Sequence, residues 1–294
     1  MESIGFIPSG QVDRFTNPIP ASDAFEEGNM ANIPPTIKVD IYIVPDRVKP
    51  IMLGASCSAE EIVQYKSLFQ EFCDVFAWTY IEILGMDPAI VEHHIDTWLD
   101  SSPIHQKQHP LYPAKAPTIK AEIDKLRRAD LIYPIEYTSW VSNPVPVNKK
   151  HGTIRVCIDY CNLNAACPKY NYPTPFIKQV VDECVGHEIL SFMDGFSGYN
   201  QIHIWYLDQY KNAFTKLWGN FTYHVMSFGL KNIGATFQCA FSYTFHDLTH
   251  IILAYLDDLT ACSKKHPNHL NDLCIIFNRC CMFNIHLNLL KCIS

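Results

Sequence analysis

Two stretches of sequence decide the fold of this chain: residues 189–199 read ILSFMDGFSGY, and residues 251–262 read IILAYLDDLTAC. Each contains a run of apolar residues that predicts a buried strand leading directly to a carboxylate. In the first stretch the strand ends at Asp194, and in the second two short strands flank Asp257 and Asp258 at a hairpin tip. We therefore expect a sheet that gathers three carboxylates at one end.

Three carboxylates in this arrangement form an oxygen-rich site suited to two Mg²⁺ ions. Two such ions can activate a 3′-hydroxyl and stabilise a leaving pyrophosphate in an in-line displacement. Each element also has a simpler interpretation. An Asp pair in a turn is commonly only solvated, and Asp194 can cap the helix that follows it.

The rest of the chain mixes helices with antiparallel strands. Ser58 and Glu61 form a capping box that begins one helix, whose expected buried face holds Ile62, Phe69, Phe72 and Phe76. Further helices are expected over 118–130, 174–186, 233–248 and 268–283. Strands are expected over 37–44, 140–147, 153–158, 189–193, 251–255 and 259–262. This order indicates the α+β class.

The composition divides the chain into three regions. Residues 1–57 are rich in proline and are expected to form a mostly irregular tail. Residues 58–114 are expected to form a connector with one amphipathic helix, and residues 115–294 the main domain.

Charge is distributed unevenly along the chain. The formal net charge is −7, but residues 1–100 hold 5 basic and 16 acidic residues, so the remainder carries a positive balance. Between Lys149 and Lys178 there are five basic residues, and Asp159 is the only acidic one. Because a ligand responds to the local field, this basic segment keeps nucleotides and nucleic acids among the expected ligands.

No apolar run approaches the length of a membrane span, and residues 1–10 lack the pattern of a signal peptide. We therefore expect no membrane partner.

Four motifs in order resemble a reverse transcriptase: RVCIDY at 155–160, SFMDGFSGYNQI at 191–202, SFGLKN at 227–232 and YLDD at 255–258. More narrowly, the chain is similar to the pol polyprotein of gypsy-type LTR retrotransposons, as found in plants. The similarity covers about residues 115–294 and extends more weakly through DVFAW at 74–78. It implies a right-hand polymerase, with a palm of antiparallel sheet and packed helices plus fingers. The sequence ends at Ser294, where the family's thumb begins, so the thumb is expected to be missing.

The resemblance implies a role for each matching residue. Asp194, Asp257 and Asp258 match the catalytic triad that binds two Mg²⁺ ions, for which Mn²⁺ can substitute, and the carbonyl of Gly195 matches a further metal ligand. The residues that match nucleotide-binding positions are Lys150, Arg155, Tyr199, Phe228, Gly229 and Lys291.

These nucleotide-binding positions have different tasks in the family. Lys150 and Arg155 match the residues that hold the incoming triphosphate, and Lys291 lies where a lysine approaches the departing pyrophosphate. Tyr199 matches the aromatic gate against a ribose 2′-hydroxyl, with a core tyrosine as the simpler interpretation. Phe228 and Gly229 match the loop beneath the incoming nucleotide, where glycine permits close backbone approach.

The implied reaction is RNA- or DNA-templated addition of dNTPs to a primer 3′-hydroxyl, and the implied location is the cytoplasm. Departures from the family pattern, such as Cys161 for arginine and Ser227 for proline, support two alternatives. One is a truncated, catalytically inactive remnant of a retroelement. The other is a module that binds nucleic acid or a partner without catalysis.

Overall fold

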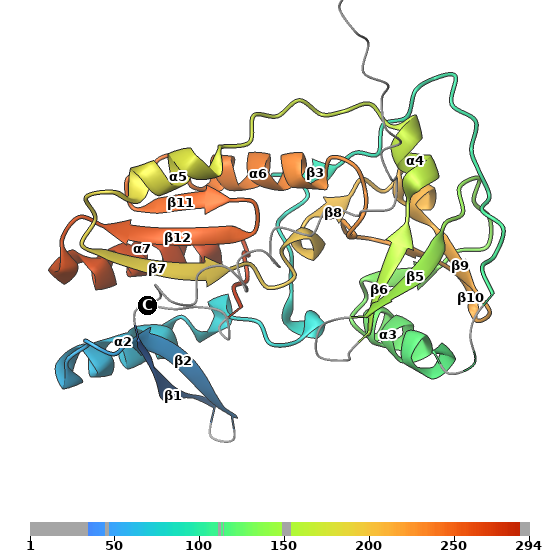
Figure 1. Cartoon of the computed structure of the whole chain (residues 1–294). Coiled ribbons are helices and arrows are strands. Elements are labelled where there is room, and N and C mark those ends of the chain that lie inside the picture. The colour runs from blue at the N-terminus through green and yellow to red at the C-terminus, as the bar shows by residue number, and fades with distance from the viewer. Residues whose placement is uncertain (1–34, 45–46, 111–112, 114, 149–153, 289–294) are drawn as a thin grey trace, which may run out of the picture.

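The computed structural model describes residues 35–44, 47–110, 113, 115–148 and 154–288. Figure 1 shows two groups of elements joined by long connections. One group, which we call the palm-like group, lies at the left of the picture, and the other, which we call the finger-like group, lies at the right.

The left-hand group is built on a three-stranded antiparallel sheet with the order β11–β12–β7. The strands are β7 (Ile189–Asp194), β11 (Ile252–Tyr255) and β12 (Asp258–Ser263). Helices α5 (Ile177–Cys184) and α6 (Ile233–Thr244) lie along the β11 side, and α7 (His269–Met282) packs against β12 (Figure 1). The predicted strand and hairpin are confirmed. The carboxylate hairpin differs in one detail, since Asp258 is the first residue of β12 and not part of the turn.

The right-hand group contains the predicted hairpin of β5 (Asn143–Asn148) and β6 (Ile154–Asp159), which pair antiparallel. A second sheet has the order β4–β10–β9, from β4 (Ile132–Pro134), β9 (Phe214–Lys216) and β10 (Gly219–Tyr223). Helices α3 (Ala116–Arg128) and α4 (Cys161–Ala166) complete this group. As predicted, α3 buries one face, formed by Ile119, Ile123 and Leu126.

The proline-rich N-terminal region contains more regular structure than its composition indicates. The expected strand is present as β1 (Thr36–Val44), but it pairs with a second strand, β2 (Arg47–Gly54), which we did not predict. Pro50 concealed β2, because proline cannot donate a ladder hydrogen bond. Both strands of a two-stranded sheet are edges, however, and an edge tolerates proline on its open side.

Helix α2 (Ala59–Glu71) begins with the predicted capping box, in which Ser58 and Glu61 exchange hydrogen bonds. It is shorter than its apolar pattern, since the chain leaves the helix at Phe72 and continues into a 3₁₀ turn. Phe69, Phe72 and Phe76 are nevertheless all buried, with ring centroids 5.4–5.7 Å from that of Phe277 in α7. The aromatic residues thus join the connector to the palm-like group.

The connector is also hydrogen-bonded into the main domain. Leu287, which is fully buried, donates its N–H to the carbonyl of Val75 and accepts from Ala77, and on its other side it bridges to Gly195. Farther along the connector, β3 (Glu92–His93) pairs in parallel with β8 (His203–Ile204). The connector is therefore part of the same core as the domain that follows it.

Several predicted helices have different bounds in the structure, and α3 begins and ends two residues before the expected 118–130. Helix α6 ends at Thr244, four residues earlier than expected, although Phe237, Phe241 and Phe245 are buried as the spacing predicted. Helix α5 begins only at Ile177, where Gln179 accepts a hydrogen bond from the N–H of Phe176. Helix α7 agrees with the prediction to within one residue at each end. Among the helices of the described residues, none combines the length and apolar character needed to cross a bilayer.

Five short 3₁₀ turns connect these elements: Cys73–Val75, Tyr80–Glu82, Gly198–Gln201, Gln209–Asn212 and His266–Asn268.

A buried chain of hydrogen bonds ties α7 to two strands of the carboxylate-bearing sheet. His269 lies between two hydroxyls, with Nε2 2.7 Å from Oγ of Ser191 in β7 and Nδ1 2.8 Å from Oγ of Ser263 in β12. The Ser263 hydroxyl donates to Asp272 at 2.5 Å. Because the Ser263 hydroxyl donates to Asp272, it accepts from the Nδ1–H of His269, and in the neutral imidazole Nε2 accepts from the Ser191 hydroxyl.

Burial lowers the pKa of His269 to about 4, although the nearby Asp272 acts in the opposite direction. Because the imidazole titrates near pH 6.5 when unfolded, its contribution is present above that pH and is lost between pH 6.5 and 4. We expect the wild-type protein to lose about 3 kcal/mol of unfolding free energy over this range relative to His269→Gln. Urea unfolding at pH 7 and pH 4 measures the difference. The control is His246→Gln, at an exposed histidine, which should keep the pH dependence of wild type. A His269→Gln variant with the same pH dependence as wild type would contradict this account.

Candidate active site

The three carboxylates predicted from the sequence come together through strand register. Asp258 lies directly opposite Asp194 in the antiparallel pair of β12 and β7. Asp257 is the turn residue immediately before Asp258, and its carbonyl accepts a hydrogen bond of 2.9 Å from the N–H of Gly195. Directly opposed residues of an antiparallel pair have their Cα atoms about 5 Å apart. Three aspartates from two distant stretches of sequence thus lie together at one end of the β7–β12 pair.

The turn that carries Asp257 is held in a strained conformation. Leu256 has φ +54°, in the left-handed region that a non-glycine residue adopts only at a cost. Gln238 of α6 supports the turn from both sides, since its Oε1 accepts from the Leu256 N–H at 2.9 Å and its Nε2 donates to the Ala254 carbonyl at 3.1 Å. The helix therefore holds the hairpin tip in place through one buried side chain.

Glycine at position 198 allows the segment after Asp194 to approach this turn closely. A Cβ atom at Gly198 would lie 3.1 Å from Cζ of Phe237 and 3.2 Å from Cβ of Asp257. Both distances are shorter than ordinary carbon contacts, so a side chain here would push the Asp257 turn away from β7. The small-residue turn noted in the sequence thus has a steric reason.

Gln201 holds the opposite side of the site and was not identified from the sequence. It is buried, its Nε2 donates to the carbonyls of Phe196 and His286, and its Oε1 accepts from the His286 N–H. Gln201 thereby fastens the segment leading to Leu287 beside Gly195. Gln201 follows Asn200 and lies two residues before His203, so the sequence around it neither marks it as buried nor reveals its partner.

Tyr199 lies in a cluster of aromatic rings next to the carboxylates. Its ring contacts Phe228 and Phe237 edge-on, with centroids 5.1 Å and 5.3 Å apart. Burial raises the pKa of the Tyr199 hydroxyl well above its usual value, and the charges of Asp257 and Asp258 add to this effect. Tyr199 is therefore an uncharged ring at the site, close enough to Asp257 and Asp258 to sense their charge.

Phe228 and Gly229 form an exposed loop beside Tyr199. The Phe228 side chain is 40% exposed, and Gly229 has φ +99°, a conformation that favours glycine. A Cβ atom at Gly229 would also lie 3.1 Å from the carbonyl oxygen of Ile158 at the end of β6. The loop therefore packs against the end of β6, and its place beneath an incoming nucleotide stays a prediction.

For three of the predicted nucleotide-binding residues, the structure does not describe the position of the side chain. Lys150 and Lys291 lie outside the described residues. Arg155 is placed by its main chain alone, in β6 opposite Val147.

The donor atoms at the site suit a hard cation, because carboxylate and carbonyl oxygens are what Mg²⁺ and Ca²⁺ prefer. Across the described part of the chain, no three His, Cys, Asp or Glu side chains form a ready-made metal-binding group. Asp194, Asp257 and Asp258 fit a metal ion for two reasons. Their backbone positions are close together, and their side chains carry oxygen donors.

Comparisons with known proteins indicate the same family as the sequence motifs. Residues 147–293, half of the chain, match the family model described as reverse transcriptase (RNA-dependent DNA polymerase). The chain is 28% identical over 207 residues to the Retrovirus-related Pol polyprotein from transposon 297 of Drosophila melanogaster, covering 69% of this chain and 20% of that protein. It is 27% identical over 230 residues to the Transposon Tf2-3 polyprotein of Schizosaccharomyces pombe, covering 76% and 17%. The chain thus spans a fifth or less of these relatives.

Solved structures that share the fold include foamy viral protease-reverse transcriptases. The crystal structure of the Prototype Foamy Virus Protease-Reverse Transcriptase CSH mutant has a TM-score of 0.72 and 19% identity, over 84% of this chain and 34% of that one. The foamy viral protease-reverse transcriptase dRH in complex with ds DNA has a TM-score of 0.72 and 20% identity, over 81% and 41%.

At these identities the likeness concerns the fold, which is the mixed helix and antiparallel-sheet architecture of a reverse transcriptase. Reverse transcriptases as a family use divalent metal ions, in keeping with the oxygen-rich end of the β7–β12 pair. From its ordered motifs, its fold and the family match, we conclude that this chain belongs to the reverse transcriptase (RNA-dependent DNA polymerase) family.

Proposed function

We propose that this chain catalyses the templated addition of deoxynucleotides to a primer 3′-hydroxyl. The observation that carries the proposal is the β7–β12 register, which sets Asp258 opposite Asp194 with Asp257 in the adjoining turn. Adjacent carboxylates repel one another unless cations or solvent neutralise them, so this constellation suits a bound cation.

Asp194, Asp257 and Asp258 would hold two Mg²⁺ ions, or Mn²⁺ in their place, with the Gly195 carbonyl as a further ligand. When bound, such ions activate the attacking hydroxyl and stabilise the leaving oxygens. Sites of this type use one or two carboxylates and take further oxygens from substrate phosphates.

The remaining site residues would orient the nucleotide. Tyr199 would exclude a ribose 2′-hydroxyl, because its ring is held by Phe228 and Phe237 and cannot easily turn away. Gly229 would let the backbone approach the nucleotide closely. We assign phosphate contacts to Lys150, Arg155 and Lys291 from the motif match.

The ligands we propose are a primer annealed to an RNA or DNA template, and dNTPs. Structural neighbours support the nucleic acid, since foamy viral protease-reverse transcriptases have been solved with dsDNA and with an RNA/DNA hybrid. We further infer that the chain derives from a gypsy-type element similar to those of plants, and that it acts in the cytoplasm.

Primer extension tests the proposed reaction. With Mg²⁺ or Mn²⁺ and dNTPs, we expect the wild-type chain to extend an annealed primer, and Asp257→Asn/Asp258→Asn to do so at least about 100-fold more slowly. The reason is that several kcal/mol of transition-state stabilisation depend on the metal ligands. Asp96→Asn/Asp100→Asn removes the same number of carboxylates from exposed connector positions and should leave extension unchanged.

A folded wild-type protein that extends no primer would contradict polymerase activity. Salt-sensitive oligonucleotide binding that persists in Asp257→Asn/Asp258→Asn would then identify the nucleic-acid-binding alternative. Loss of binding as well would identify the inactive remnant.

Sugar selection tests the role of Tyr199. We expect Tyr199→Val to raise the rate of ribonucleotide relative to deoxyribonucleotide incorporation by about tenfold or more, since the smaller side chain leaves room for a 2′-hydroxyl. The measurement is single-nucleotide extension with each dNTP and its ribonucleotide. Tyr206→Val, at a tyrosine that is 70% exposed, provides the control. An unchanged ratio in a folded Tyr199→Val protein would mean that Tyr199 serves the core and not the substrate.

A further inference from the structure

Lys216 is a buried cation for which the described residues offer no partner. It is the last residue of β9, opposite Gly219 in β10, and its side chain is 5% exposed. No hydrogen bond or ion pair joins the Lys216 ammonium group to another described residue, and burial lowers its pKa. Burying an unpaired charge is expensive, so a lysine in this position calls for an anion.

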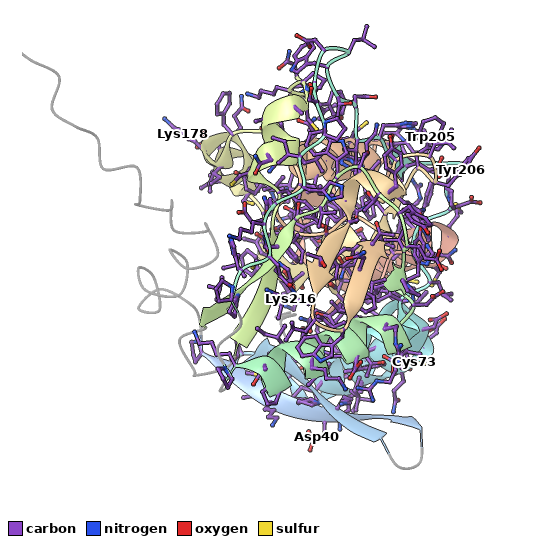
Figure 2. The ribbon with its side chains drawn as sticks, turned by 90° about the vertical axis from the view of Figure 1, so that its right-hand side faces the viewer. Asp40, Cys73, Lys178, Trp205, Tyr206 and Lys216 are labelled. Atoms are coloured by element: carbon purple, nitrogen blue, oxygen red, sulfur yellow. The ribbon has the colours of Figure 1, made fainter. Side chains whose placement is uncertain are left out.

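The Lys216 side chain lines a cavity of about 260 Å³ between β5, β9 and the start of α3. Figure 2, in which Lys216 is labelled, shows it beside the β5–β6 hairpin and close to α3. The lining is completed by the β5 residues Pro144, Val145 and Pro146 and by His109, Pro110 and Lys115. It contains two lysines and a histidine but no acidic residue. The cavity therefore has a positive field and apolar walls, which increase the strength of a charge interaction.

Helix α3 adds to this field. Lys115 immediately precedes its first residue, so the positive end of the helix dipole faces the same region. The first turn of α3 carries no acidic residue, and no side chain caps it. The Ala116 N–H donates to the Pro113 carbonyl and Pro117 has no N–H, so the helix contributes to the field through its dipole.

A larger hollow continues from this cavity. It has a volume of about 700 Å³ and shares His109 and Pro110 with the first. Its lining includes Lys107 and His105 and one acidic residue, Asp159. A ligand bound at Lys216 therefore has room to extend along the surface of the fingers.

We propose that this cavity binds a phosphate group through Lys216 and Lys115, with the adjoining hollow receiving the rest of a nucleic-acid strand. The site lies on the finger-like sheets, away from the carboxylates, and does not require catalysis. A phosphate group of a strand and a free phosphate ion share the chemistry that Lys216 recognises, so the two sources are distinguished by experiment.

Inorganic phosphate is the first probe. We expect Lys216→Met to weaken its binding about tenfold or more, as measured by the phosphate-dependent rise in melting temperature at constant ionic strength. Lys115→Met should weaken it as well. Lys178→Met is the matched control, because Lys178 is an exposed lysine of α5 in the other group of elements (Figure 2) and should leave the affinity unchanged.

Thermal stability without phosphate provides an independent readout. Since Lys216→Met removes a buried unpaired charge and retains most of the side-chain volume, its melting temperature should equal or exceed that of wild type. A lysine with a purely structural role would behave in the opposite way. Equal phosphate affinity in wild type and folded Lys216→Met, or a marked loss of stability with retained phosphate binding, would overturn the proposal.

A fluorescein-labelled single-stranded oligodeoxynucleotide is the second probe. If the phosphate belongs to a strand, Lys216→Met should reduce the slope of log K against log salt by about 0.7. An unchanged slope with lost phosphate binding assigns the site to a free phosphate ion. Failure of the polymerase proposal would be seen separately, as phosphate binding by a wild-type protein that extends no primer.

Discussion

The register between β7 and β12 is the constraint on which the rest of the site depends. Side chains alternate between the two faces of a strand, so a slip of one residue would move Asp258 away from Asp194 and reverse every buried residue of β12. Met193 and Leu259 pair on the buried face, whereas Phe192, on the opposite face, is half exposed. The hydrophobic pattern that buries one face therefore also aligns the carboxylates on the other.

Polar side chains inside the fold hold this alignment at three points. His269 joins β7 and β12 to α7, Gln238 joins the hairpin tip to α6, and Gln201 joins the turn after Asp194 to the segment before Leu287. Each satisfies two or more buried groups. Buried hydrogen bonds of this kind are directional, whereas apolar packing is not. These hydrogen bonds therefore fix the relative positions of the strands and turns that carry the three carboxylates.

Much of this arrangement could be predicted because the signals were local. The strand ending at Asp194, the YLDD hairpin and the capping box at Ser58 are each encoded within about ten residues. The pairing of β12 with β7 was not predictable in detail, since it depends on packing against α7. Strand β2 was missed because Pro50 signals irregular structure in most contexts. Lys216 was missed because a lysine before a turn is ordinarily solvated, and only the placement of β5 beside β9 buries it.

The position of Leu287 has a consequence for how such a domain can be inherited. A segment beginning near residue 115 would carry all four motifs, and the matched family region begins later still, at residue 147. Yet Leu287 makes main-chain hydrogen bonds to Val75 and Ala77, and Phe277 packs against connector phenylalanines. An element that acquired only the motif-bearing segment by recombination would receive a palm with an open edge and an exposed aromatic surface. The segment that can be exchanged between elements is therefore longer than the segment that carries the motifs. The connector has to be inherited together with the catalytic residues.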